Sequence, residues 1–143
     1  MDLATVGGAA LGRSLRGIGV NILTRDAGAL ARFVAGVFDL PLVRASADFA
    51  LVRHGDHLMQ FHSDAAFAGH PVQGLLPENP PRGAGVQVYL FHTDPDAAAA
   101  RAEAAGGILL EPPRDKPHGL REATILSPEG YAFTAAKVLE DHA

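Results

Sequence analysis

The sequence of 143 residues contains no cysteine, and it has no apolar run near the roughly 18 residues that a membrane-spanning helix needs. The lack of cysteine excludes disulfide bonds, a thiol nucleophile and a thiolate metal site, and it fits the cytoplasmic location that we expect. Positive charge is also scarce, because 12 Lys and Arg stand against 16 Asp and Glu and no block of basic residues occurs. We therefore expect neither a nucleic-acid nor a membrane partner.

The sequence has enough apolar residues for one packed domain. Hydrophobic residues make up 48% and charged residues 20%, a balance that excludes disorder along the whole chain. Residues 1–16 stand apart from the rest. Asp2 lies where a signal peptide carries positive charge, and Gly7-Gly8 interrupts the apolar run, so we expect a flexible tail.

Two stretches of the remaining chain share one pattern. In residues 17–26 and again in 85–94, a short alternating apolar run ends in an aspartate, and an alanine-rich amphipathic segment follows. Such a repeat indicates two similar modules in one domain spanning 17–138. We place the first module at about 17–63, a linker rich in proline and glycine at about 64–84, and the second module at about 85–138.

Periodicity gives each module the same elements. In the first, alternation over 18–25 predicts a strand, and Asp26 is a candidate cap for a helix with one apolar stripe: Leu30, Phe33, Val34, Val37 and Phe38. Two runs at 49–52 and 58–62 predict further strands. In the second, Asp94-Pro95 begins a helix that Gly106-Gly107 ends, and strands are expected at 108–110, 122–126 and 131–137, with a loop at 112–117.

These motifs together resemble the vicinal oxygen chelate superfamily, which includes glyoxalase I, extradiol dioxygenases and bleomycin-resistance proteins. Residues 26–41 resemble its first-helix pattern, 87–97 the start of its second module, and Ser127-Pro-Glu-Gly-Tyr131 its turn before the last strand. The resemblance covers about 16–137. It implies an α+β fold with two tandem βαβββ modules, a cupped mixed sheet around a cavity, and helices on the convex side.

The resemblance also implies where a divalent metal would be bound, on four strands of the cavity. The matching positions here are Gly19, Gln60, Gln87 and Thr134. Glycine has no donor atom, and two neutral amides with a hydroxyl supply no charge, whereas transition metals favour imidazole, carboxylate or thiolate. We therefore expect no metal and no other cofactor. The alternative is a divalent metal that recruits His62 with Gln60 and Gln87.

The implied cup would be lined by polar and aromatic side chains, a suitable set for a small organic ligand. The expected ligand-binding residues are Asn21, Gln60, His62, Gln87, Tyr89, Phe91, Arg121 and Thr134. Strand parity places Phe61 and Val88 beneath the helices instead. No catalytic residue is assigned. His62 is a candidate general base, although a structural histidine at a strand end is the interpretation that we favour, and His118 is a further candidate ligand contact.

Three functions follow from these residues. The first is a metal-independent protein of the glyoxalase/bleomycin-resistance type that binds a small ligand in its cup. The second is a metal-dependent glyoxalase-like lyase or isomerase, or a relative of the dioxygenases. The third is a scaffold whose cavity is filled by its own side chains. In each case we expect a homodimer, since the superfamily commonly pairs and open sheet edges need cover.

Overall fold

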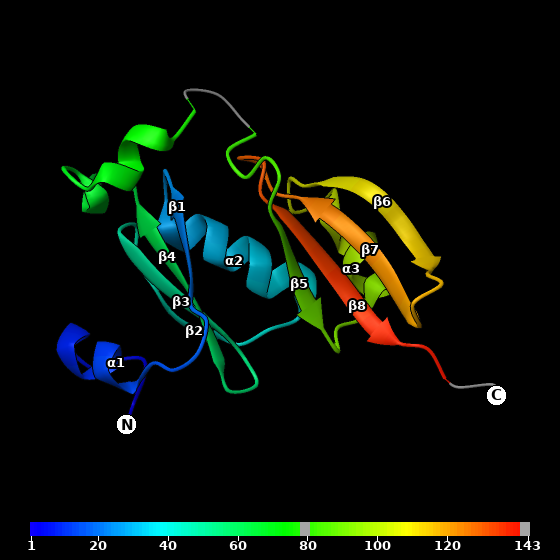
Figure 1. Cartoon of the computed structure of the whole chain (residues 1–143), viewed down its shortest axis with the longest axis horizontal. Coiled ribbons are helices and arrows are strands. Elements are labelled where there is room, and N and C mark those ends of the chain that lie inside the picture. Colours follow the sequence, from blue (N-terminus) through cyan, green and yellow to red (C-terminus); the bar gives the residue numbers. More distant parts are fainter. Residues whose placement is uncertain (78–80, 141–143) are drawn as a thin grey trace. The chain divides into compact units, whose positions relative to one another are not determined.

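Figure 1 shows the computed structural model of the chain, which describes residues 1–77 and 81–140. Two compact units make up the chain. The first comprises Met1–Ala35 and Leu40–Leu75, and the second comprises Gly36–Asp39 with the described residues from Leu76 onward. Each unit contains one four-stranded mixed sheet. The expected α+β fold of two tandem βαβββ modules is thereby confirmed.

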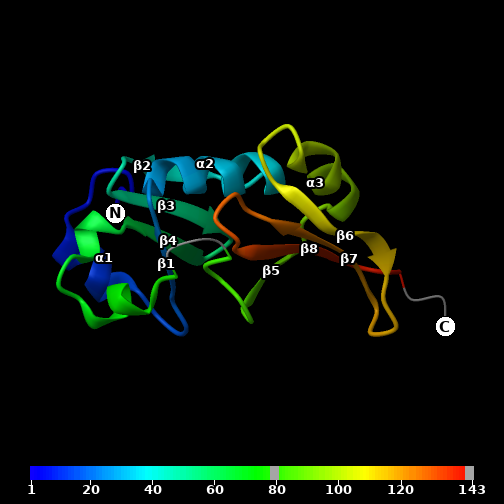
Figure 2. The ribbon, with the colours of Figure 1, turned by 90° about the horizontal axis from the view of Figure 1, so that it is seen from above.

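The first unit has strand order β1-β4-β3-β2. β1 and β4 pair in parallel, and the other two pairs are antiparallel. Helix α2 lies along one side of this sheet (Figure 2). The elements are α1 (Gly8–Ser14), β1 (Val20–Thr24), α2 (Ala27–Phe38), β2 (Leu42–Ala45), β3 (Phe49–His54), β4 (His57–Ser63) and two short 3-10 helices, η1 (Ala65–Phe67) and η2 (Pro71–Leu75).

The second unit repeats this arrangement with strand order β5-β8-β7-β6. β5 and β8 pair in parallel, and β8–β7 and β7–β6 are antiparallel. Its elements are β5 (Gln87–Phe91), α3 (Pro95–Ala102), β6 (Ile108–Asp115), β7 (Leu120–Leu126) and β8 (Ala132–Val138). The strand that follows α3 is thus part of the second sheet, as the duplicated plan requires.

Both long helices begin at the aspartates that the sequence indicates. The carboxylate of Asp26 accepts a hydrogen bond from the amide of Ala29 at 3.0 Å, and that of Asp94 accepts from Asp96 and Ala97. Such caps satisfy amides that have no partner inside the helix. The predicted apolar stripe of α2 is buried along its whole length.

The turn before β8 explains one glycine of the sequence motif. Gly130 has a φ of +93°, and a Cβ placed there would lie 2.3 Å from the Cα of Pro81. The amide of Gly130 donates to the carbonyl of Ser127, and the Ser127 hydroxyl accepts from the amide of Tyr131. Only glycine fits this backbone and this close approach.

Three elements differ from the sequence prediction, and the first is β2, at Leu42–Ala45, where no strand was expected. Residues 8–14, expected within a flexible tail, form α1, and Leu11 of this helix is buried. Pro112 and Pro113, expected in a loop, lie inside β6, which extends to Asp115. β6 is the outer strand of its sheet, and its pairing with β7 is irregular between Leu109 and Arg114. An edge strand tolerates proline because half of its backbone groups need no partner in the sheet.

The linker between the modules is also partly ordered. It contains η1 and η2, while its residues 78–80 lie outside the described part of the chain. Among the residues described, no helix has both the length and the apolar character needed to cross a membrane.

Candidate functional site

In the first unit, three of the expected ligand-binding residues share one face of the sheet. Asn21 of β1 pairs with Gln60 of β4, and His62 follows two residues after Gln60. Because side chains alternate along a strand, all three lie on the face opposite to that of Phe61. Phe61 is completely buried. This unit therefore has one polar face and one apolar face.

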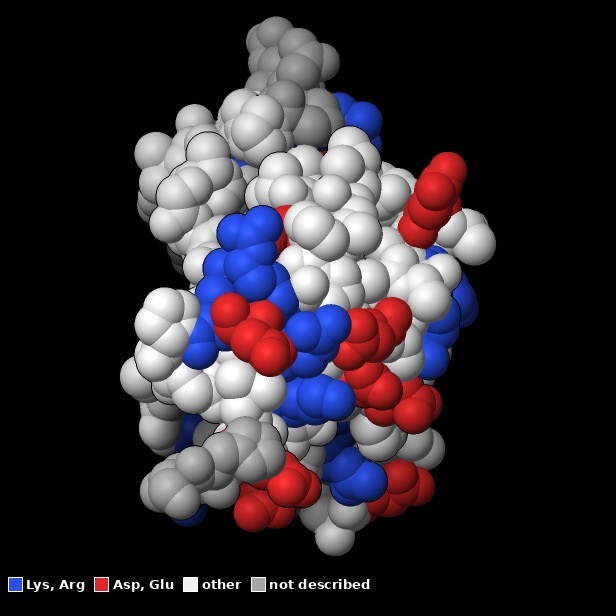
Figure 3. Space-filling model, turned by 90° about the vertical axis from the view of Figure 1, so that its right-hand side faces the viewer, with Lys and Arg blue, Asp and Glu red and all other residues white. Residues whose placement is uncertain are grey.

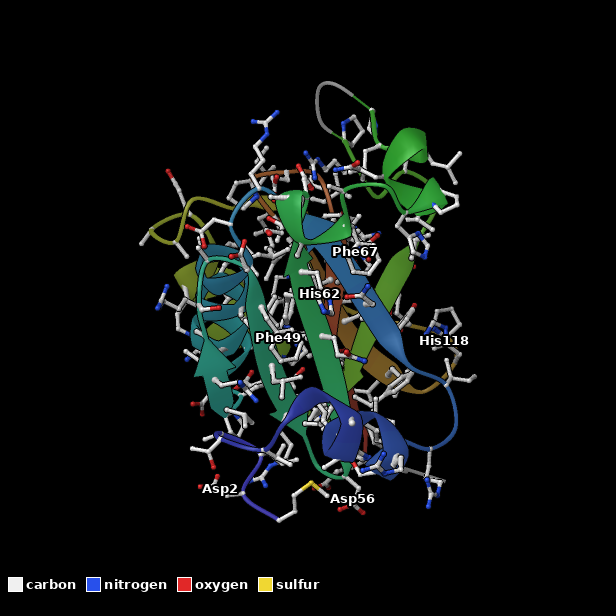
Figure 4. The ribbon with its side chains drawn as sticks, turned by 90° about the vertical axis from the view of Figure 1, so that its left-hand side faces the viewer. Asp2, Phe49, Asp56, His62, Phe67 and His118 are labelled. Atoms are coloured by element: carbon white, nitrogen blue, oxygen red, sulfur yellow. The ribbon has the colours of Figure 1, made fainter. Side chains whose placement is uncertain are left out.

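His62 is held in a defined position on the polar face. Its Nδ1 lies 2.6 Å from Oδ1 of Asn21. Since an amide oxygen only accepts, Nδ1 is the donor, and a neutral ring then keeps a lone pair on Nε2. The ring packs between Phe49 and Phe67, with centroid distances of 4.9 and 5.0 Å (Figure 4).

Burial in these surroundings lowers the pKa of His62 below its ordinary value. The imidazole is therefore neutral at pH 7, because burial away from water disfavours its charged form. A neutral, oriented imidazole with a free lone pair can accept a hydrogen bond from a ligand, or a proton. This is the property that a general base needs.

The polar face of the first unit is partly covered by the N-terminal segment. Two pockets remain beside α1, and Leu15 and Gln60 line both of them. The larger, of about 660 Å³, extends along the turn between β3 and β4 and includes Gly19 and Arg53. The smaller, of about 340 Å³, lies between α1 and His62. Volumes of this size suit small organic ligands.

In the second unit, four expected ligand-binding residues also share one face: Gln87, Tyr89, Phe91 and Thr134. Tyr89 pairs with Thr134 across β5 and β8. Nε2 of Gln87 donates to Oγ1 of Thr134 at 2.6 Å, and that hydroxyl lies 2.8 Å from the hydroxyl of Thr124. Val88 and Leu90 alternate with these residues and belong to the opposite face.

A second hydrogen-bonded group on this face is centred on Glu122 of β7. Its side chain is only 5% exposed. One carboxylate oxygen accepts from the hydroxyl of Tyr89 at 3.1 Å, and the other lies 2.5 Å from Nε2 of His118. Burial, followed by the hydrogen bond to Glu122, raises the pKa of Tyr89 above its ordinary value. Phe91 stacks on Tyr89 and is 48% exposed.

Arg121 does not lie with these residues, and its expected role in the polar lining is corrected by the structure. Because it precedes Glu122, its side chain points to the other face, where its guanidinium pairs with Asp96 of α3 and with Asp115. The hydrogen bond from Arg121 holds the pKa of Asp96 below its ordinary value. Figure 3 shows the surface on this side of the chain, where basic and acidic side chains lie next to one another and form no extended patch of one sign.

The residues at the superfamily's metal positions do not fit a divalent ion. Gly19 has no side-chain donor, and the hydroxyl of Thr134 is fully buried and already shared with Gln87 and Thr124. Gln60 and Gln87 offer only neutral amides, which are poor ligands for a transition metal without an imidazole or carboxylate. No group of three or more His, Asp or Glu side chains suited to a metal occurs among residues 1–77 and 81–140.

Sequence reasoning did not place two residues that belong to these faces. Glu122 was expected at the start of a strand and was given no role in the site, but the alternation of β7 puts its side chain on the same face as that of Thr124. Arg44 of β2 lines the smaller pocket, and the pairing of β2 with β3 sets its position. The alternation of Glu122 and Thr124 is visible in the sequence, whereas the covering of Arg44 by the N-terminal segment has no local signal.

Comparisons with known proteins agree with this geometry. A family model described as a glyoxalase-like domain matches residues 18–136. A comparison with curated proteins found no match. Among solved structures, a glyoxalase/bleomycin resistance protein/dioxygenase family enzyme from Burkholderia phytofirmans PsJN is 25% identical, with a TM-score of 0.68, over 84% of this chain and 96% of that one.

Two further structures show the same fold at lower identity. A glyoxalase/bleomycin resistance protein/dioxygenase from Nocardioides is 21% identical, with a TM-score of 0.61, over 92% of this chain and 90% of that one. The fosfomycin resistance protein FosX from Mesorhizobium loti is 17% identical, with a TM-score of 0.59, over 86% and 92%.

Proposed function

We propose that this chain, which belongs to the glyoxalase-like domain family of the vicinal oxygen chelate superfamily, binds a small organic ligand on the polar faces of its sheets without the superfamily's metal site. One observation carries the proposal. In the first unit, Gln60 and the oriented ring of His62 line a pocket of about 340 Å³ whose other walls include the apolar side chains of Leu11, Leu15 and Phe49. Pockets with apolar walls and a few positioned polar groups are typical of ligand sites.

The names of the structural relatives fit this proposal only in general terms. They describe resistance proteins and enzymes, and they assign no ligand to this chain. Fold alone does not confer activity, so the proposal rests on the pocket and its polar groups. A scaffold filled by its own side chains is disfavoured by the two pockets beside α1.

The test is a fragment screen by ligand-observed NMR, combined with metal analysis of the same purified protein. We expect fragments to bind the wild type, to lose most of their binding in His62→Ala, and to keep it in His54→Ala. His54 is a half-buried histidine at the end of the neighbouring strand β3 and lines neither pocket. We expect no stoichiometric Zn, Ni, Mn or Fe. Equal binding by both variants, or no binding at all, would contradict the proposal.

A catalytic form of this proposal is favoured by the lone pair on Nε2 of His62. In that case the chain would be a glyoxalase-like lyase or isomerase, with His62 as general base. The metal-dependent alternative, in which His62 helps to hold a divalent ion, predicts a different result in the metal analysis. A stoichiometric metal signal that disappears in His62→Ala would support the metal-dependent alternative and contradict the metal-free proposal.

We also propose that the chain forms a homodimer. The outer strand β6 carries three consecutive exposed apolar residues, Ile108, Leu109 and Leu110. An open edge strand with apolar side chains tends to pair with another chain or to be covered. We expect sedimentation velocity at micromolar concentration to show a dimer. Sedimentation as a monomer alone at that concentration would defeat this expectation.

A further inference from the structure

The smaller pocket of the first unit has an unusual charge for this chain. One wall includes Leu11 of α1 and Leu15, the residue that follows this helix, and the other consists of Arg44, Phe49, Gln60 and His62. The chain as a whole is acidic, with a formal net charge of −4. Nevertheless, among the described residues that line the pocket there is a guanidinium and no carboxylate. A cation in a partly enclosed space attracts an anion more strongly than it would in open water.

Arg44 is held in place with most of its hydrogen-bond capacity unused. Its Nη1 donates to the carbonyl oxygen of Val6 at 2.9 Å. Its guanidinium carbon lies 5.3 Å from the centre of the Phe49 ring, a favourable position for a cation over an aromatic face. In the described part of the chain, no Asp or Glu pairs with it. A guanidinium has five N–H donors, so a planar fork remains available.

The other walls define what would accompany the anionic group. Phe49, Leu11 and Leu15 offer apolar surface, and Gln60 offers an amide that can donate a further hydrogen bond. His62 presents a lone pair, since its Nδ1 is engaged with Asn21. The pocket therefore suits a molecule with one planar anionic end and an apolar body.

We infer that the ligand of this pocket is a small monocarboxylate with an apolar body, whose carboxylate binds the guanidinium of Arg44. The planar fork of arginine matches a carboxylate with two parallel hydrogen bonds. The apolar body then packs against Phe49 and against the side chains of α1. This inference rests on the proposed function and adds the chemical class of the ligand.

The test compares phenylacetate with phenylacetamide, which has the same shape and no charge. Both are titrated into the full chain, and binding is measured by calorimetry or NMR. Hydrogen bonds to charged groups contribute enough that we expect phenylacetate to bind about 10- to 100-fold more weakly to Arg44→Gln than to the wild type. Arg32→Gln is the matched control, because Arg32 is an exposed arginine of α2 in the same unit and lines neither of the two pockets. It should change the affinity less than about twofold.

The amide and a second variant separate the possible outcomes. Phenylacetamide should bind weakly and equally to wild type and Arg44→Gln. Arg44→Lys keeps the charge without the fork, so it should restore part of the affinity for phenylacetate. Equal affinity of the wild type for acid and amide, or an unchanged affinity in Arg44→Gln, would overturn the inference. If fragments bind through His62 while no carboxylate does, the ligand class is wrong and the proposed function stands.

Discussion

Replacing Phe61 with alanine is expected to lower the free energy of unfolding by about 3–5 kcal/mol, the usual range for removing a fully buried phenylalanine. Phe61 is 0% exposed and lies at the centre of β4, on the apolar face of the first sheet. Its removal leaves a cavity that the packed neighbours fill only in part. Equilibrium unfolding in urea, followed by circular dichroism, measures the change.

The adjacent residue is the matched control. Gln60→Ala changes a half-buried side chain on the polar face, so we expect a change in stability within about 0.5 kcal/mol and a loss of ligand binding instead. Of these two neighbouring residues, one substitution would thus lower stability and the other would lower ligand binding. If Gln60→Ala destabilised the chain as much as Phe61→Ala, the register of β4 would be wrong. Gln60 and His62 would then not lie on the polar face, and their assignment to the ligand site would be wrong as well.

The contrast between these two residues also explains what the sequence predicts well. Alternation along β4 and β5 is a local property, and a strand that is buried on one side must follow it. The caps at Asp26 and Asp94 are local as well, because each carboxylate binds amides within three residues. Strand parity and helix starts can therefore be predicted from short stretches of sequence.

Other features depend on contacts between distant parts of the chain. α1 contains two glycines, Gly8 and Gly12, and a third glycine is its N-cap, so local preference disfavours this helix and the burial of Leu11 in the folded unit favours it. The hydrogen bond from Arg44 to Val6 joins residues 38 positions apart. Arg121 was expected to precede its strand, where alternation does not fix the direction of a side chain. β7 begins at Leu120, so Arg121 lies within the strand, on the face opposite to that of Glu122, and pairs with Asp96 of α3.

Replacing Glu122 with glutamine is expected to lower the pKa of Tyr89. Burial is the main cause of the raised pKa of Tyr89, and the hydrogen bond to Glu122 and its negative charge raise it further. Glutamine keeps the shape of the acceptor and removes the charge. The pKa should therefore fall but stay above the ordinary value of about 10, since burial is unchanged. Absorbance of tyrosinate, measured against pH in a Tyr131→Phe background, reports Tyr89 alone, because the chain has two tyrosines.

The same change should appear in stability at alkaline pH. The folded pKa of Tyr89 lies above its unfolded value, so the folded chain binds the proton more tightly. This contribution is fully present below the unfolded pKa and is lost as the pH rises through the folded pKa. The wild type should therefore lose more stability above about pH 10 than Glu122→Gln does. His118→Ala keeps the charge of Glu122 and should leave the pKa of Tyr89 raised. An ordinary pKa of Tyr89 in the wild type would mean that water reaches this face freely, and Gln87, Tyr89 and Thr134 could then not form a partly desolvated ligand surface.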